Sequence, residues 1–441
     1  MYQPAPTRGD TAWFVHDRFG MFIHWGLYAL PARHEWVMNA EKMTVDEYSK
    51  YFEIFNPDLF DPKAWAKAAR EAGMKYFVIT TKHHEGFCLW DTQQTDFKIT
   101  NTPFGRDALR EVVEAFRAEG LRVGFYYSLL DWHHPDFPID SYHPQRDVPD
   151  AIERNKNCDM TRYAAYMREQ LRELLSDYGK IDILWVDFSY PDLNKNGLNG
   201  KGHQDWESEK LLALVRELQP HIIINNRLDL PYEIASVQTD VSTPEQVQPD
   251  EWVRVKGKPV VWEACQTLSG SWGYHRDETT WKSDEQLIQI LISTVACGGN
   301  LLMNVGPTAR GIFDSRALDA LRVYGEWMSL HSRSIYGCTQ SEYAAPFGCK
   351  LTQNGNRLYL HIYNWPFKHL RLKGLRSKVQ YAQLLNDASE VKIVRHAHIN
   401  PDNPTEHGDL PASELDEETL TLELPVVKPD VIVPVIELFL N

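Results

Sequence analysis

The sequence predicts an α/β protein, a somewhat irregular (β/α)8-like barrel of the TIM type followed by a C-terminal β-sandwich. Between about residues 20 and 307, short apolar runs alternate with helical patterns, which indicates parallel strands covered by helices. No GxGxxG turn opens this region, so a closed barrel is favoured over an open dinucleotide-binding sheet. After about residue 336, short alternating segments between turn residues predict an all-β unit.

The first region contains eight candidate strands, which are GMFIHW, KYFVITT, LRVGFYYS, IDILWVD, HIIINN, SVQTD, PVVWE and NLLMNVGP. SVQTD is the weakest, because the stretch before it is too short for a full helix, and we expect an irregular barrel there. Helical segments end at Gly73, Gly120 and Gly179, where a C-cap favours glycine, and Ser283 with Gln286 predicts a capping box. We expect the catalytic barrel in residues 1–335 and the sandwich in residues 336–441.

Composition narrows the class of partner. The formal net charge of −15 disfavours nucleic acid and anionic membranes, and no apolar run reaches the length of a transmembrane helix. The N-terminal stretch has no basic segment followed by an apolar core, so we expect no secretory signal and a cytoplasmic protein. The 6 cysteines lack CxxC spacing, so we expect reduced thiols and no structural zinc. The 14 Trp and 20 Tyr suit a carbohydrate ligand, although an aromatic-rich core would explain them equally well.

Polar and titratable residues follow most of the predicted strands. Because active sites of such barrels form at the carboxyl ends of the strands, we expect these side chains to meet there. They are His24, His83, His84, Tyr126, Tyr127, Asp187, Asn226, Arg227, Glu263 and Asn304.

Asp187 is the sharpest candidate. An apolar strand delivers its carboxylate to the barrel mouth, and Trp185 points to the same side two residues earlier. Such a carboxylate suits a nucleophile that attacks a sugar anomeric carbon. A retaining glycosidase needs a second carboxyl group roughly 5–5.5 Å away, and Glu245, Glu263 and Glu35 are candidates that sequence spacing cannot separate.

The paired histidines do not predict a metal site. His83–His84 and His133–His134 are adjacent pairs, whose side chains point to opposite sides of an extended segment, and no HExxH pattern occurs. We therefore expect no metal, and histidines that bind sugar hydroxyls.

A family resemblance rests on FGMFIHWGLYAL, EWVMN, AKAAREAGMKYFVITTKHHEGFCLWDT, GFYYSLLDWH, ILWVDF, TPEQ, WEACQTLSGSWGY and NLLMNVGPTARG. In this order, over about residues 10 to 340, they resemble the blocks of family 29 glycoside hydrolases. The resemblance implies an α-L-fucosidase with a (β/α)8-like barrel and a C-terminal β-sandwich. It also implies double displacement with retention, no cofactor, and a fucosylated oligosaccharide or glycoconjugate as substrate.

Carried over residue by residue, the resemblance makes Asp187 the nucleophile. It implies that fucose is held by His24, Glu35, Trp36, His83, His84, Tyr127, Trp185 and Arg227. Tyr127 is chosen over Tyr126 only because it adjoins the serine of GFYYS. The acid/base varies in position within the family; the TPE block makes Glu245 the first choice, and Glu263 is the reserve.

This sequence departs from the family where Phe188 follows the nucleophile, since many members carry a small residue there. Three alternatives stay open at this point: an exo-hydrolase of a related galacto-configured sugar, a non-catalytic carbohydrate-binding protein, and a metal-dependent hydrolase. The linkage preferred and the oligomeric state, including a homo-oligomer, are also open.

Overall fold

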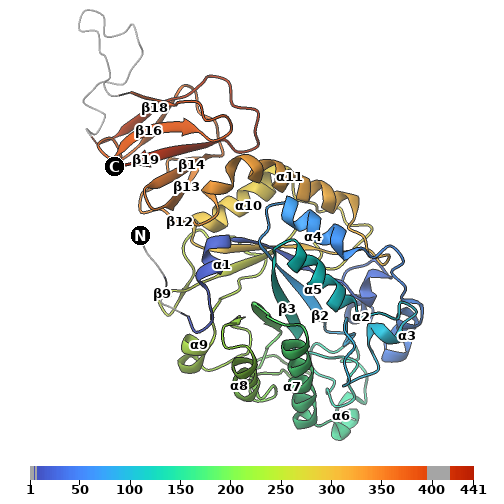
Figure 1. The fold of residues 1–441 in the computed structure, drawn as a ribbon. Coiled ribbons are helices and arrows are strands. Elements are labelled where there is room, and N and C mark those ends of the chain that lie inside the picture. Colours follow the sequence, from blue (N-terminus) through green and yellow to red (C-terminus); the bar gives the residue numbers. More distant parts are fainter. Residues whose placement is uncertain (1–3, 5–6, 395–417) are drawn as a thin grey trace, which may run out of the picture.

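The structure is a computed structural model that describes Pro4 and residues 7–394 and 418–441. Figure 1 shows a sheet surrounded by helices, with a smaller β unit beside α10 and α11. The sheet has the strand order β10-β11-β1-β2-β3-β4-β7, and every pair is parallel. Its strands are β1 (Phe19–Ile23), β2 (Tyr76–Lys82), β3 (Arg122–Ser128), β4 (Ile183–Asp187), β7 (Ile223–Ile224), β10 (Glu263–Thr267) and β11 (Asn300–Val305).

Single parallel bridges connect β7 to β10. Asn225 pairs with Val241, Ser242 pairs with Trp262, and Glu245 pairs with Cys265. The segment after Asp240 therefore occupies the position of a missing strand, and the curled sheet is (β/α)8-like, as the sequence predicts.

Two strand predictions are wrong in detail. Residues 236–238 of SVQTD belong to the short helix α9 (Tyr232–Gln238) instead of a strand. PVVWE was expected to end a strand at Glu263, whereas Glu263 begins β10 opposite Asn300, the first residue of β11. The register with β11 places the strand further along the chain than its apolar residues suggest.

The predicted signals lie at the ends of four long helices. Gly73, Gly120 and Gly179 have φ of 87°, 77° and 70°, in the left-handed region that glycine tolerates. The capping box of Ser283 and Gln286 is present at the start of α10. The long helices of the barrel are α4 (Pro62–Glu71), α5 (Ala108–Ala118), α7 (Met160–Asp177), α8 (Ser208–Leu218), α10 (Asp284–Ala296) and α11 (Ser315–His331).

The connections contain short elements. Helices there are α1 (Ala12–Asp17), α2 (Val37–Ala40), α3 (Val45–Ile54) and α6 (Ala151–Arg154), with 3-10 turns η1 (Leu27–Ala29), η2 (Ile99–Asn101), η3 (Asn155–Asn157) and η4 (Ser332–Ser334). Two hairpins are formed by β5 (Asn194–Lys195) with β6 (Leu198–Asn199) and by β8 (Arg254–Val255) with β9 (Lys258–Pro259). In the described part of the chain, none of the helices is both long and apolar enough to cross a membrane.

Alternation along the strands decides which side chains enter the barrel. One cluster fills the interior, with Phe22, Val78, Tyr126, Trp185 and Leu302 among its members. Their sequence neighbours pack outward, against the helices, in the larger core cluster. The barrel interior is thus a packed core. Its layer nearest the carboxyl ends of the strands lies directly under the space where the strand-end residues meet.

The C-terminal unit consists of two antiparallel sheets, of order β12-β13-β14-β19-β16 and β15-β18-β17. Leucines of both sheets share one buried cluster, so the sheets pack face to face as a sandwich. The domain boundary after residue 335 stays a prediction. The strands are β12 (Thr339–Gln340), β13 (Cys349–Asn354), β14 (Arg357–Ile362), β15 (His369–Leu372), β16 (Val379–Leu384), β17 (Lys392–Val394), β18 (Leu420–Glu423) and β19 (Val435–Leu440).

Candidate active site

A small cavity of ≈ 90 Å³ lies at the carboxyl ends of the barrel strands. Five of the ten residues predicted from the strand ends line it, namely His24, His83, His84, Tyr126 and Asp187. Its lining is Phe22, His24, Glu35, Trp36, His83, His84, Tyr126, Trp185, Asp187, Phe188, Glu245, Cys265 and Trp272.

Asp187 is held by two donors at this cavity. The Tyr126 hydroxyl donates to Oδ2 at 2.8 Å, and Arg227 Nη1 donates to Oδ1 at 2.7 Å. Burial, and then the charge of Asp187, raises the pKa of Tyr126 well above its ordinary value, so the hydroxyl keeps its proton. Both oxygens of the carboxylate are therefore oriented by fixed groups.

Glu245 shares the same guanidinium. Its Oε2 lies 2.9 Å from Arg227 Nη1, and its side chain is 42% exposed against 12% for Asp187. Arg227 is itself anchored by Nε and Nη2, which donate to the hydroxyl and carbonyl of Thr243. Burial lowers the pKa of Arg227, but nearby negative groups, with Asp187 foremost, raise it beyond its ordinary value. One charged group thus fixes both carboxylates.

The shared contact with Arg227 sets an upper limit on the distance between the Asp187 and Glu245 carboxylates. Asp187 Oδ1 and Glu245 Oε2 cannot lie further apart than the sum of their distances to Nη1. That bound is shorter than the roughly 6.5–9.5 Å between the carboxyl groups of inverting glycosidases and is close to the roughly 5–5.5 Å of retaining ones.

Aromatic rings form the walls of the cavity. The Trp185 ring stacks on Tyr126 with centroids 5.6 Å apart, and the Arg227 guanidinium lies 4.5 Å above its centroid. The rings of Phe22 and Trp272 pack edge to face, with their centroids 5.8 Å apart. Phe22 could have been found in the sequence, because it precedes His24 by two residues and faces the same side. Trp272 lies in a loop and gives no such periodic signal.

The histidines of the cavity are suited to neutral hydrogen bonding. His24 Nδ1 lies 2.6 Å from Asn304 Oδ1, and His84 Nδ1 lies 2.7 Å from Ser128 Oγ. Burial, and then the neighbouring His83, holds the pKa of both rings well below the ordinary value. A neutral imidazole has one nitrogen that donates and one that accepts, which fits a sugar hydroxyl.

Glu35 ties two loops of the rim together. Its Oε2 accepts a hydrogen bond of 2.7 Å from the backbone N–H of Gly273. A Cβ at Gly273 would lie 2.9 Å from Tyr28 and 3.0 Å from the Glu35 backbone nitrogen, so the approach requires glycine. Glu35 is thereby oriented beside Trp36 in the lining.

Two predicted site residues lie elsewhere. Tyr127 points away from the cavity, and its hydroxyl donates to Gln170 of α7 at 2.8 Å. Tyr126 occupies the position expected for Tyr127, because strand alternation turns it inward. Glu263 is 1% exposed and begins its strand, so it lies at the amino end of the barrel and does not line the cavity.

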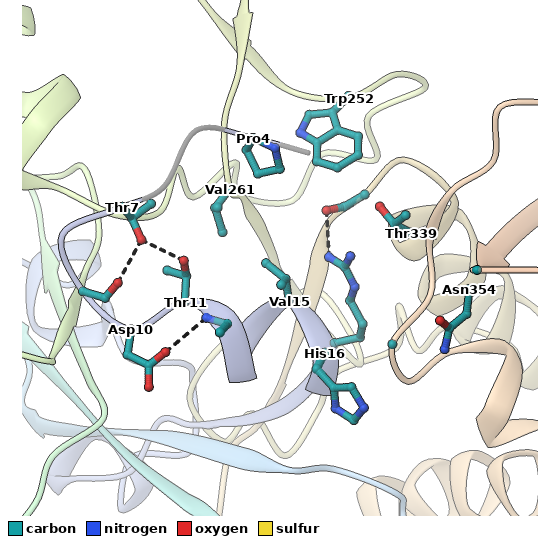
Figure 2. Close-up of a pocket in the computed structure, with 16 residues that line it drawn as sticks. Pro4, Thr7, Asp10, Thr11, Val15, His16, Trp252, Val261, Thr339 and Asn354 are labelled. Atoms are coloured by element: carbon teal, nitrogen blue, oxygen red, sulfur yellow. Dashed lines mark hydrogen bonds between the residues drawn. The ribbon is translucent and has the colours of Figure 1, made fainter. Parts of the chain in front are cut away.

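A larger cavity of ≈ 580 Å³ lies at the other end of the barrel (Figure 2). Its lining includes Arg18, Val261 and Gly298, which precede β1, β10 and β11, and also Thr339 of β12. It contains none of the strand-end residues predicted for the site. Among the described residues, no group of three or more His, Cys, Asp or Glu side chains is arranged to hold a metal.

Comparison with known proteins identifies similar chains. The family model "Alpha-L-fucosidase" matches residues 3–333. Alpha-L-fucosidase isoenzyme 1 from Paenibacillus thiaminolyticus is 45% identical with a TM-score of 0.88, and the match covers 98% of both chains. A GH29 alpha-L-fucosidase from Bacteroides thetaiotaomicron, solved as a trapped covalent intermediate with 2-fluoro-fucosyl fluoride, is 28% identical with a TM-score of 0.82, over 100% of this chain and 98% of that one. Human plasma alpha-L-fucosidase is 28% identical over 427 residues, 90% of this chain and 84% of that protein.

Proposed function

The chain belongs to the alpha-L-fucosidase family, glycoside hydrolase family 29, and from this premise we propose which of its residues carry out the reaction. The enzyme is a retaining exo-glycosidase that releases terminal α-L-fucose from fucosylated oligosaccharides or glycoconjugates. The shared contact of Asp187 and Glu245 with Arg227 Nη1 is the observation that carries the assignment.

In the first displacement, a carboxylate oxygen of Asp187 attacks the anomeric carbon. The bond to the glycosidic oxygen breaks, and Glu245 gives its proton to that oxygen, which leaves as the hydroxyl of the aglycone. The donors on Asp187, Tyr126 and Arg227, fix the direction from which the carboxylate attacks.

In the second displacement, Glu245 acts as a base. It takes a proton from a water molecule, whose oxygen attacks the anomeric carbon and releases the Asp187 carboxylate. Two inversions at the same carbon give retention. The partial exposure of Glu245 suits this role, because aglycone and water both need access to it.

Recognition of fucose follows from the walls of the cavity. His24, His83, His84 and Glu35 offer donors and acceptors for the ring hydroxyls. The aromatic rings of Phe22, Trp185 and Trp272 offer apolar contact for the C–H faces and methyl group of a 6-deoxy sugar.

The test compares wild type with Asp187→Ala and Glu245→Ala on 2,4-dinitrophenyl and 4-methylumbelliferyl α-L-fucosides. We expect Asp187→Ala to lose at least about 10³-fold in activity and azide to rescue it as β-fucosyl azide. Glu245→Ala should lose activity chiefly on the poorer leaving group, with azide yielding the retained α-product. Retention of full activity by Asp187→Ala contradicts the assignment, and wild type without activity on either substrate contradicts the function.

A further inference from the structure

Glu263 is a buried carboxyl group that the reaction above does not use. The Tyr76 hydroxyl donates to its Oε2 at 2.5 Å, and the Tyr76 hydroxyl also accepts from Asn300 Nδ2 at 3.3 Å. Burial raises the pKa of Glu263 to about 7, although its interactions with Tyr76 and Trp185 act in the opposite direction and lower the pKa. Placing a carboxyl in a barrel core is costly unless its hydrogen bonds compensate, so its contacts are informative.

The contact with Trp185 connects Glu263 to the active site. The indole N–H of Trp185 is buried and makes no full hydrogen bond, and its interaction with the Glu263 carboxyl is one of the two that lower the pKa of that carboxyl. The two residues come from β10 and β4, so the contact spans the barrel interior. The Trp185 side chain also lines the cavity at the active site.

Trp185 in turn supports both groups that hold the nucleophile. Its ring stacks on Tyr126 at 5.6 Å with an interplanar angle of 22°, and Arg227 lies 4.5 Å above its centroid. Tyr126 and Arg227 are the two donors to Asp187. A rotation of the indole would therefore shift both donors together.

We propose that Glu263 is a positioning residue for fucoside hydrolysis: fixed by Tyr76, it holds the Trp185 indole, and Trp185 aligns Tyr126 and Arg227 on Asp187. This inference rests on the proposed role of Asp187. It gives Glu263 a function different from the acid/base role for which the sequence holds it in reserve. Small displacements of reacting groups reduce rates strongly, about 10²-fold for 1 Å, which makes such support measurable.

The experiment compares Glu263→Gln, Glu263→Ala and Tyr76→Phe with wild type. Glu437→Gln is the matched control, since Glu437 is 3% exposed in the C-terminal sheet and accepts from the Tyr359 hydroxyl at 3.3 Å. The concentration of active sites is titrated with 2-fluoro-fucosyl fluoride, and kcat and KM are then measured per active site on both aryl fucosides used above.

We expect Glu263→Ala to lower kcat/KM per titrated site about 10- to 100-fold on both substrates, without acceleration by azide. Glu263→Gln keeps an acceptor for the indole and should recover part of that loss, and Tyr76→Phe should show a smaller loss of the same kind. Glu437→Gln should keep wild-type kinetics per site.

Two results overturn the inference while the proposed function stands. One is unchanged kinetics per active site in the Glu263 and Tyr76 variants, which would leave Glu263 a stability residue like Glu437. The other is a loss confined to the poorer leaving group with azide acceleration, which would make Glu263 the acid/base. Wild type that releases no fucose from either substrate overturns the proposed function itself.

Discussion

Tyr126 and Tyr127 are neighbours on β3 that point to opposite sides of the barrel wall. Tyr126 donates to Asp187, and Tyr127 donates to Gln170 behind the sheet. They form a natural pair for a test, because each loses one buried hydroxyl on substitution by phenylalanine.

We expect Tyr126→Phe to lower kcat/KM about 10- to 100-fold, because a hydrogen bond to a charged group contributes about 1.5–3 kcal/mol. Tyr127→Phe should lower stability by about 1 kcal/mol and leave kcat/KM near the wild-type value. Steady-state kinetics on an aryl α-L-fucoside and urea unfolding measure the two effects. The reverse pattern would restore the sequence-based choice of Tyr127.

At the scale of an element, the residue that follows β4 has a strained backbone conformation. Phe188, directly after Asp187, has φ of 81°, where a Cβ is unfavourable. Its ring contacts Trp36 at 5.4 Å and His84 at 4.8 Å. Glycine at this position would relieve the backbone but remove this wall of the cavity.

The strain can be measured by comparing Phe188→Gly with Phe188→Ala, which lose the same ring. We expect the glycine variant to be more stable by about 0.5–1 kcal/mol, because the left-handed penalty of alanine outweighs the greater unfolded-state entropy of glycine. At Tyr190, which lies outside the left-handed region, the order should reverse. Urea unfolding gives the four values, and equal stability of both Phe188 variants would argue against a positive φ.

The same scale shows where the sequence was sufficient. β2, β3 and β4 follow directly from apolar runs, and Asp187 follows from its place at the end of one. β10 does not, because its register is set by pairing with β11 and the apolar residues before Glu263 lie outside the strand. The segment after Asp240 joins the sheet only through single bridges, which leave no periodic pattern in the sequence. The short helix α9 occupies most of the strand expected at SVQTD. The strands placed by tertiary pairing were therefore the ones misjudged, whereas the choice of Tyr127 over Tyr126 failed because the alternation of side chains along β3 was not applied.

At the scale of the whole molecule, buried histidines join the barrel to the sandwich. His331 ends α11, His361 lies in β14, and Trp327 lies within 4.8 Å and 6.3 Å of their rings. The Trp327 indole also donates to Val433 of the sandwich at 3.0 Å. Burial lowers the pKa of His331 to about 4, and burial together with the charge of His331 lowers the pKa of His361 to about 3.

These shifts predict how stability depends on pH. Both histidines have an ordinary pKa near 6.5, so the unfolded chain binds their protons before the folded protein does. The stabilisation from neutral His331 and His361 is nearly complete above about pH 6.5 and is lost as the pH falls toward 4 and then 3, by about 3 kcal/mol per histidine at pH 4. Replacing His361 with Met removes one titrating group, so the free energy of unfolding should fall less between pH 6.5 and 4 than in wild type.

Urea unfolding followed by tryptophan fluorescence at each pH measures this difference. His16→Gln is the control, because the His16 side chain is 65% exposed. An unchanged pH slope in His361→Met would mean that the junction does not titrate, and that acid sensitivity arises elsewhere in the protein.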